Sequence, residues 1–281
     1  MNVLVTGPYG RCGTAIIDHL HDREEYDFTY LNRSDRPDDH PYGGYDTVVA
    51  DVTDYDAIRP AFDGQDAVIH LAAYPYTDGS WDDVHDPNVD GMHNVLEAAR
   101  DAEVETFVFG STNHVMGMFE LENEPEIYYP GHGIALDHTD PVRPDSYYGT
   151  TKSFGENLGR QYVENDEYEY PMRFYALRIC TVNDAEYDHP YGDAEAGVDE
   201  GEFERDSDEY ERRVARMKGM WQSRRDFAHL IDCCLEDDTV EFDVFNGVSD
   251  NDRRWYSLEH ARSVLGYAPR DNGEEWDEPP A

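Results

Sequence analysis

Short apolar runs alternate with longer segments of mixed polarity through the first 180 residues of the chain. Near-continuously apolar runs are typical of strands that are buried on both faces of a sheet. The longer segments carry apolar residues at helical spacing. The pattern predicts strands at residues 3–6, 28–31, 47–50, 67–72, 106–110 and 174–179, separated by helices that are clearest at 94–102 and 147–163.

Strands that alternate with helices indicate a parallel sheet with helices on both faces. The predicted fold class is therefore α/β, a Rossmann-like doubly wound parallel sheet with a small C-terminal lobe. We assign residues 1–179 to the Rossmann-like domain and residues 180–281 to the lobe, which is interleaved with it. The second part is predicted to contain an ordered acidic lid at 184–213, a helix at 224–235, a strand at 240–245, a short helix at 258–265 and a loose tail at 271–281.

The composition is strongly acidic, with 63 Asp and Glu residues against 22 Lys and Arg residues and a formal net charge of -41. Such a chain lacks the basic surface that nucleic acids require, so nucleic-acid binding is excluded. With 39% hydrophobic and 13% aromatic residues, it still has enough apolar material for a packed core. The acids are spread along the whole chain, and Lys152 and Lys218 are its only lysines. We interpret this as a surface adapted to high salt, where screening tolerates dense like charge.

The sequence lacks the patterns of membrane spans, secretory signals, metal sites and disulfide frameworks. No run of about 18 apolar residues is present, so we expect no membrane-spanning helix. The N-terminus shows no apolar signal core, and we expect a cytoplasmic protein. The spacing of His132, Asp137 and His138 matches no strong ligand pattern, so no metal is expected. The cysteines lack CxxC spacing and are expected to be reduced, buried thiols: Cys12, Cys180, Cys233 and Cys234.

The first predicted strand runs into the stretch TGPYGRCG, which contains three glycines. Glycine lets the backbone approach a pyrophosphate closely, and a following helix offers free N–H groups and the positive end of its dipole. A glycine string alone is weak evidence, but this one follows the first strand and opens a helix. We therefore predict that Gly7, Gly10, Arg11 and Gly13 bind a dinucleotide.

The stretch SYYGTTK holds one of the two lysines, four residues after a tyrosine. On a helix, Tyr148 and Lys152 share one face. A free tyrosine has a pKa of about 10 and is a poor base at neutral pH, but a neighbouring cation favours the phenolate. The compact ammonium of lysine can also hold a ribose, a task that the planar fork of arginine does not fit equally. We predict that Tyr148 is a general base and Lys152 its partner, whereas Tyr147 lacks the spacing.

Five motifs follow one another in order: the glycine loop, DVTD at 51–54, HLAAY at 70–74, FVFGSTN at 107–113 and YYGTTK at 147–152. This set resembles the extended short-chain dehydrogenase/reductase family, also called the NAD-dependent epimerase/dehydratase family. The resemblance covers residues 1–179 well and the remainder loosely. It implies that Thr112 supplies the hydroxyl that holds the reacting oxygen. It also implies cofactor contacts from Asp51, Val52, Leu71, Ala72, Ala73 and Lys152.

The residues after the second predicted strand depart from the pattern of this family. An acid there would hold the adenosine ribose of NAD, but the chain reads Asn32, Arg33, Ser34 and Asp35. Arginine with serine suits a 2′-phosphate, whereas Asp35 is the alternative ribose acid if the strand ends later. We therefore expect NADP or NAD as cofactor, with NADP slightly favoured and Arg33 as its phosphate ligand.

The strings GSTNHVMG, RPDSYYGTTKSFGENLGR and ALRI resemble a narrower group, the uronate dehydrogenases and the glucose-6-phosphate dehydrogenases of halophilic archaea. Those enzymes oxidise the anomeric carbon of a pyranose to a lactone. The resemblance implies a sugar site in which Asn113, His114 and Arg178 touch the sugar beside Ser111 and Tyr148. It also implies that Asn88 braces the catalytic network. The adjacent Arg224 and Arg225 would add positive charge for a phosphate, so glucose 6-phosphate is the favoured substrate.

The arginines and the function both have alternatives at this point. Arg178 could form an internal ion pair, and Arg224 or Arg225 could pair with surface acids such as Asp226. The alternative functions are a uronate dehydrogenase, a nucleotide-sugar epimerase or dehydratase, and a non-catalytic dinucleotide-sensing protein. The roughly 100 residues after the last strand of the first part favour a small substrate, and the predicted catalytic residues favour an enzyme. A homo-oligomer is compatible with the sequence.

Overall fold

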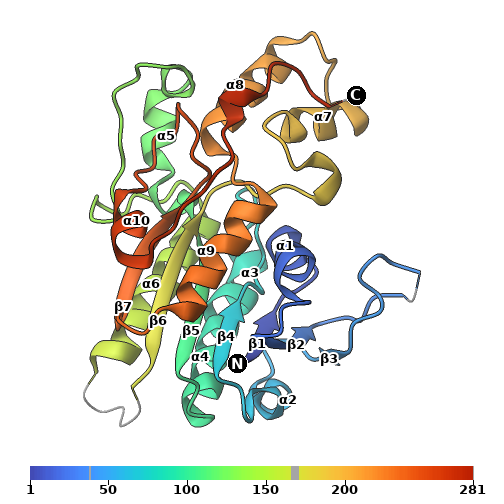
Figure 1. The fold of residues 1–281 in the computed structure, drawn as a ribbon, viewed down its shortest axis with the longest axis vertical. Coiled ribbons are helices and arrows are strands. Elements are labelled where there is room, and N and C mark those ends of the chain that lie inside the picture. Colours follow the sequence, from blue (N-terminus) through green and yellow to red (C-terminus); the bar gives the residue numbers. More distant parts are fainter. Residues whose placement is uncertain (38, 166–170, 281) are drawn as a thin grey trace.

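The computed structural model describes residues 1–37, 39–165 and 171–280 of the chain. These residues form a seven-stranded, all-parallel sheet in the order β3-β2-β1-β4-β5-β6-β7 (Figure 1). This is the strand order of a doubly wound fold, so the predicted fold class is confirmed. The strands are β1 (Asn2–Thr6), β2 (Asp27–Asn32), β3 (Thr47–Val49), β4 (Ala67–His70), β5 (Thr106–Thr112), β6 (Arg173–Ile179) and β7 (Phe242–Gly247).

Helices connect the strands and form the lobe. The α-helices are α1 (Arg11–Leu20), α2 (Tyr55–Ile58), α3 (Trp81–His85), α4 (Gly91–Asp101), α5 (Met118–Asn123), α6 (Tyr147–Glu164), α7 (Gly192–Asp199), α8 (Asp208–Met220), α9 (Arg224–Glu236) and α10 (Glu259–Leu265). A π-helix, η2 (Asp86–Asp90), precedes α4, and the short 3₁₀ helices are η1 (Arg59–Phe62), η3 (Asn113–Met116), η4 (Glu126–Tyr128), η5 (Ala185–Tyr187) and η6 (Gly273–Glu275). In the described part of the chain, none of these helices has both the length and the apolar character needed to cross a membrane.

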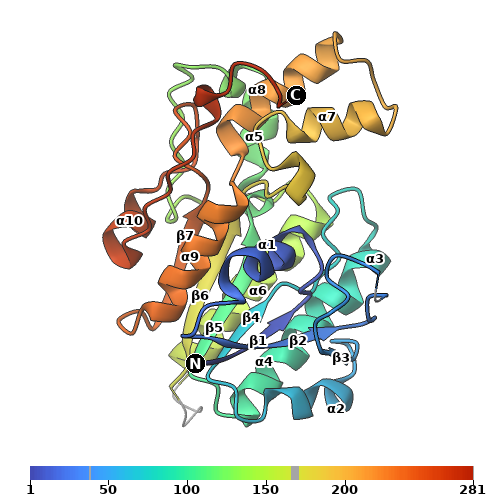
Figure 2. The ribbon, with the colours of Figure 1, turned by 45° about the vertical axis from the view of Figure 1, so that its right-hand side comes forward.

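Helices cover both faces of the sheet (Figures 1 and 2). On one face, α1 and α9 pack together and bury Ile16 and Phe227 with Val108 of β5. On the other face, α4 and α6 bury Val95 and Tyr162 against Phe107 of β5. Neighbouring residues of a strand point to opposite faces, so a strand covered on both sides reads as a continuous apolar run. For this reason the apolar pattern located each strand to within two residues of its observed ends.

Residues 180–281 contribute to the sheet domain as well as to the lobe. β7 pairs with β6, and α9 packs on α1, so both belong to the Rossmann-like layers. The acidic segment predicted as a lid forms α7 and α8, which lie at the end of the molecule away from the N-terminus (Figure 2). A small apolar cluster of Tyr191, Ala194 and Tyr210 holds these two helices together. The sequence predicted the lid but gave no sign of its helices, because the segment has few aliphatic residues.

The prediction of a loose C-terminal tail is wrong for residues 271–276. The backbone N–H of Gly273 donates to Oδ1 of Asn251, a fully buried side chain, over 2.8 Å. The ammonium of Lys218 donates to the carbonyl of Trp276, also over 2.8 Å. A stretch rich in acid and proline looks unstructured in sequence, but here its backbone supplies partners for polar groups of the lobe.

Candidate active site

The loop between β1 and α1 leaves room for a diphosphate. Gly7 has a φ of +70°, and a Cβ at this position would lie 2.8 Å from the backbone nitrogen of Ala72, so a side chain does not fit. A Cβ on Gly13 would lie 2.4 Å from the backbone of the same loop. α1 starts after Gly10 without a side-chain cap, which leaves its first N–H groups available to an anion. The geometry of this loop therefore fits a bound dinucleotide.

The residues predicted to contact the adenosine side lie just after β3 and β4: Asp51, Val52, Leu71, Ala72 and Ala73. The Asp51 carboxylate accepts hydrogen bonds from the backbone and the hydroxyl of Thr53, which shapes the turn after β3. The segment after β4 is tied to the end of β1, because Leu71 N donates to Thr6 O over 3.1 Å and Ala72 N to Thr6 Oγ1 over 3.3 Å. The structure thus gathers these residues beside the glycine loop.

Two arginines follow β2. Arg33 is exposed and forms no hydrogen bond or ion pair with the rest of the described chain. The guanidinium of Arg36 lies over the ring of Tyr9, 5.2 Å from its centroid, and Tyr9 belongs to the glycine loop. The carboxylate of Asp35, the alternative ribose acid, accepts from the backbone N–H of Arg36 over 2.8 Å. Arg33 therefore has a guanidinium free to bind a phosphate, whereas Asp35 is already engaged.

The predicted catalytic residues come together from β5 and α6. Thr112 ends β5, while Tyr148 and Lys152 lie in the first two turns of α6, which Ser146 caps. The side chain of Thr112 lies close enough to the phenol of Tyr148 to lower its pKa. Lys152 Nζ lies 6.0 Å from the centroid of the Tyr148 ring and donates a 2.6 Å hydrogen bond to Gly110 O. The structure therefore groups these three side chains as the sequence predicted.

Burial controls the charge state of this cluster. Lys152 is 4% exposed, and desolvation lowers its pKa from 10.5 to about 8. Burial also raises the pKa of Tyr148, and the side chain of Thr112 offsets only part of this rise. The structure thus holds a neutral phenol, and the neighbouring ammonium alone does not produce the phenolate. Cys12 of the glycine loop interacts electrostatically with both Tyr148 and Lys152, so the loop and the cluster face each other.

The turn after β5 places two further predicted residues beside the phenol. His114 Nδ1 hydrogen-bonds to Oδ2 of Asp145 over 2.6 Å, and its ring meets the Tyr148 ring at a centroid distance of 6.1 Å. Asn113 is buried and accepts at its carbonyl from the hydroxyl of Tyr256 over 3.0 Å. Its Nδ2 has no hydrogen-bond partner among the described residues. A buried amide donor without a partner is available to a substrate oxygen.

Two contacts fix the catalytic helix against this turn. A Cβ on Gly149 would lie 2.4 Å from His114 O, so glycine allows α6 to approach closely. Asn88 of η2 donates to Thr151 Oγ1 over 3.0 Å and exchanges hydrogen bonds with the backbone of Tyr74. Both the amide oxygen and the amide nitrogen of Asn88 are engaged in these hydrogen bonds. Asn88 therefore braces α6 and the segment after β4, as expected from the sequence, and directs no group to a sugar.

Arg178 and Ser111 are not available as the predicted sugar ligands. Arg178 of β6 is 3% exposed and forms a bidentate ion pair with Glu156 of α6, at 3.0 and 2.9 Å. Ser111 Oγ donates to the same carboxylate over 2.6 Å. The structure thus shows the alternative reading, an internal ion pair, because α6 brings a buried acid against β6.

Arg224 and Arg225 are engaged elsewhere, so the predicted phosphate clamp is wrong. Arg224 is 2% exposed, and its guanidinium pairs with Asp18 of α1 and donates to Thr14 and to the carbonyls of Arg11 and Asn183. This arginine joins α9 to α1. Arg225 pairs with Asp271 over 2.7 Å at the surface.

The structure brings a different arginine to the catalytic region. Arg216 of α8 pairs with Glu120 of α5, with 2.5 Å between Nε and Oε1. Burial raises the pKa of Glu120, but Arg216 outweighs this effect and the pKa is lowered, with a smaller contribution from His114. The charges of Glu120 and Arg216 also influence the pKa of Tyr256. The hydroxyl of Tyr256 donates a hydrogen bond to the carbonyl of Asn113. No described residue accepts a hydrogen bond from Arg216 Nη1. No motif pointed to Arg216, which follows the acidic segment 184–213.

The sequence profile of the NAD dependent epimerase/dehydratase family matches residues 3–234 of the chain. This range contains the glycine loop, the cluster of Tyr148 and Lys152, and most of α9. The chain belongs to this family. The resemblance stated from the ordered motifs is thereby confirmed.

Within the family, two relatives from Haloferax volcanii align with almost the whole chain. An NAD-dependent glucose-6-phosphate dehydrogenase is 39% identical over 278 residues, which cover 98% of this chain and 95% of the relative. An L-arabinose 1-dehydrogenase (NAD(P)(+)) is 34% identical and covers 96% of each chain. Among solved structures, the uronate dehydrogenase from Agrobacterium tumefaciens aligns with a TM-score of 0.71 and 26% identity, covering 100% of this chain and 90% of that one.

Proposed function

We propose that the protein is an NAD(P)-dependent sugar dehydrogenase that oxidises the C1 hydroxyl of a pyranose to the lactone, with glucose 6-phosphate as the favoured substrate. The observation that carries this proposal is the contact between Thr112, Tyr148 and Lys152 beside the glycine loop. A proton acceptor next to a dinucleotide site is what the oxidation of an alcohol requires. The relatives support the substrate class, since they are named as dehydrogenases of glucose 6-phosphate, L-arabinose and uronates.

In this mechanism Tyr148 first releases its own proton to solvent, and the phenolate then accepts the proton of the C1 hydroxyl while the hydrogen on C1 leaves as a hydride. The C1–H bond breaks, a C1=O bond forms and the ring oxygen stays attached, so the product is a lactone. A bound nicotinamide dinucleotide supplies the hydride acceptor. Thr112 holds the substrate oxygen near the phenol, and the ammonium of Lys152 favours the phenolate that must form.

The far end of the sugar distinguishes the substrates of these relatives. A phosphate or a carboxylate at C6 calls for a cation, whereas L-arabinose carries neither group. Arg216 suits this task, because its Nη1 lacks a partner among the described residues and Glu120 holds the guanidinium in place. Its charge reaches Tyr256, which bonds to Asn113 beside the catalytic cluster. Arg216 thus replaces Arg224 and Arg225 as the proposed ligand of the anionic group.

Both forms of the cofactor fit the adenosine end. The Haloferax glucose-6-phosphate dehydrogenase is named NAD-dependent, the arabinose enzyme takes NAD(P), and a solved uronate dehydrogenase mutant is complexed with NAD. The exposed Arg33 adds a cation for a 2′-phosphate. We therefore propose that the enzyme accepts NAD and NADP.

The direct test measures the reduction of NAD and of NADP by the purified protein in concentrated KCl. The substrates are glucose 6-phosphate, glucuronate, galacturonate, L-arabinose and free glucose, with Tyr148→Phe as the inactive control. We expect the highest kcat/KM with glucose 6-phosphate.

Other outcomes would redirect the proposal. Oxidation of a uronate without activity on glucose 6-phosphate would replace the phosphorylated substrate by a carboxylated one. If no free or phosphorylated sugar is oxidised, but a nucleotide sugar is epimerised or dehydrated, the C1 oxidation is refuted.

A further inference from the structure

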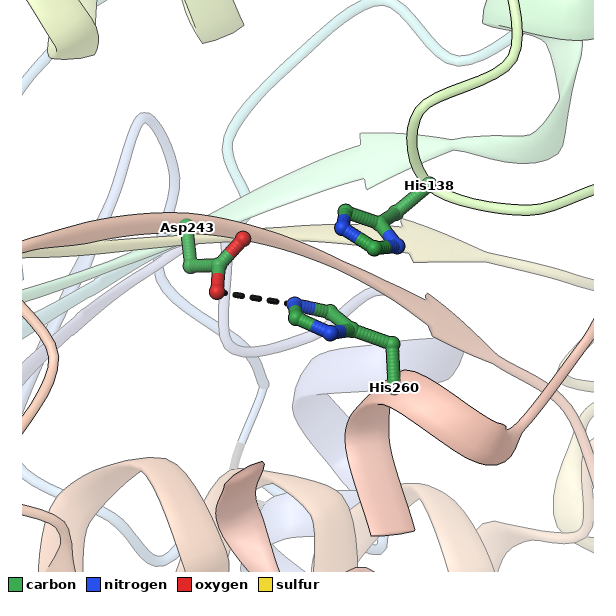
Figure 3. A group of neighbouring side chains, drawn as sticks. All are labelled: His138, Asp243 and His260. Carbon is green, nitrogen blue, oxygen red and sulfur yellow. Dashed lines mark hydrogen bonds and ion pairs between the residues drawn. The ribbon is translucent and has the colours of Figure 1, made fainter. Parts of the chain in front are cut away.

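Three side chains of types that can bind a metal meet at β7, the last strand in the sheet order, outside the active site: His138, Asp243 and His260. They come from the segment before α6, from β7 and from α10, and their ligand atoms all lie within 4.8 Å of one another. The two imidazole rings stack with a centroid distance of 3.5 Å and an interplanar angle of 9°. Figure 3 shows a nitrogen of each ring on the side where the carboxylate of Asp243 lies.

Each imidazole also has its own carboxylate partner. Asp243 Oδ2 lies 2.8 Å from His260 Nε2, and Asp137 Oδ1 lies 2.7 Å from His138 Nδ1. Asp137 comes this close without making a hydrogen bond, so Nδ1 of His138 is a buried nitrogen that lacks a hydrogen-bond partner among the described residues. Such a nitrogen is available as a ligand atom.

An ion pair alone explains only part of this arrangement. It accounts for His260 with Asp243, but it gives no reason for a second imidazole in face-to-face contact with the first. The side chains of the three residues are only 21 to 26% exposed, which sets them apart from the many acids on the surface.

We propose that His138, Asp243 and His260 bind a divalent transition metal ion, and that Zn²⁺ is the ion this donor set suits best. Two imidazoles and one carboxylate are ordinary Zn²⁺ ligands, at about 2.0 to 2.2 Å from the ion. The ion replaces the proton shared by His260 and Asp243, and the rings turn from their stack so that both lone pairs meet at the metal. The sequence led to the opposite expectation, because His138 and His260 are far apart in the chain and Asp243 lies within a strand.

The ion would add a link between three segments that Asn246 and Leu136 already join by hydrogen bonds. The backbone carbonyl of His138 accepts a hydrogen bond from Arg178 Nη1 over 3.3 Å, and Arg178 pairs with Glu156 of the catalytic helix. The bound metal would therefore hold the segment that leads into α6, as a structural site and not as part of the reaction.

The test uses Zn²⁺ alone and the whole chain, stripped of metal with a chelator and dialysed against Zn²⁺ in concentrated KCl. Wild type should bind about one ion per chain, and Zn²⁺ should raise its melting temperature. Asp243→Asn, which keeps the size of the side chain, and His260→Ala should each weaken Zn²⁺ binding by more than roughly 10-fold.

A second cluster on the surface gives a matched control. His85, Asp86 and Asp90 also come within 4.8 Å of one another, but both carboxylates are exposed. His85→Ala should leave the stoichiometry and the melting shift unchanged. The proposal is overturned if wild type binds no Zn²⁺ above the level of Asp243→Asn, or if His85→Ala loses as much binding as His260→Ala. The catalytic assays do not enter this comparison, so it stands or falls apart from the proposed reaction.

Discussion

The buried lysine of the active site carries a cost that can be measured. Lys152 is 4% exposed, hydrogen-bonds to Gly110 O, and has its Nζ 4.8 Å from the centroid of the Phe109 ring. These contacts do not compensate for the hydration that the ammonium loses on burial, so the pKa of Lys152 falls from 10.5 to about 8. We predict that Lys152→Met abolishes activity but makes the stability of the protein less dependent on pH.

The sign and size of this effect follow from proton linkage. In the unfolded chain the lysine keeps its proton up to pH ~10.5, whereas in the folded protein it releases the proton near pH 8. Between these values the unfolded state binds more protons, so the free energy of unfolding of wild type rises with pH. The slope is about 1.4 kcal/mol per pH unit, which amounts to about 3 kcal/mol over the whole window. Below pH 8 both states hold the proton, so the full destabilisation of about 3 kcal/mol is present and no longer changes with pH.

The measurement is urea-induced unfolding of wild type and Lys152→Met in one KCl concentration, from pH 7 to 9.5. The difference between the two proteins isolates the lysine, because the other titrating groups are shared. Wild type should gain about 2 kcal/mol relative to the variant over this range. Lys218→Met, which removes the other lysine, is the matched control for the loss of a lysine side chain. A pH-independent difference between wild type and Lys152→Met would refute the argument that Lys152 is charged and desolvated.

Three further predictions concern catalysis and binding. Tyr148→Phe should lower kcat by about 10²-fold or more and leave dinucleotide affinity intact, as measured by turnover and by fluorescence titration; near-normal turnover would contradict its role as base. Arg33→Ala should weaken NADP binding by about 1.5–3 kcal/mol and hardly change NAD binding, and equal effects would show that Arg33 is a surface residue. Arg216→Ala should raise the KM for glucose 6-phosphate tenfold or more, with little effect on a neutral sugar, whereas Arg225→Ala should change neither KM. A larger effect of Arg225→Ala than of Arg216→Ala would instead support Arg225 as the phosphate ligand.

The fold and the catalytic cluster could be predicted because both depend on local sequence patterns. Strands covered on both faces are continuously apolar, and the four-residue spacing of Tyr148 and Lys152 places them on one face of any helix. The glycine loop was recognisable because only glycine tolerates the φ of Gly7 and its approach to Ala72. Each of these signals lies within a few consecutive residues.

The partners of charged residues could not be predicted in the same way. With 63 acids in the chain, an arginine has many candidate partners, and tertiary packing alone decides among them. Arg178 meets Glu156 because α6 packs on the sheet, and Arg224 meets Asp18 because α9 packs on α1. Both arginines were read as ligands of the sugar or its phosphate because their partners lie elsewhere in the sequence and only the packing of the helices brings them together.

The same structure explains why a chain that relies on arginine keeps two lysines. A guanidinium has five N–H donors in a rigid plane, and a buried arginine such as Arg178 needs a carboxylate and further acceptors to satisfy them. The space beside Tyr148 offers Lys152 a single protein acceptor, Gly110 O, which leaves the other ammonium protons for a ribose. Lys218 likewise reaches a single carbonyl, that of Trp276, beneath the C-terminal segment. An arginine at either place would bury donors without partners, so lysine is retained where one compact charge is required.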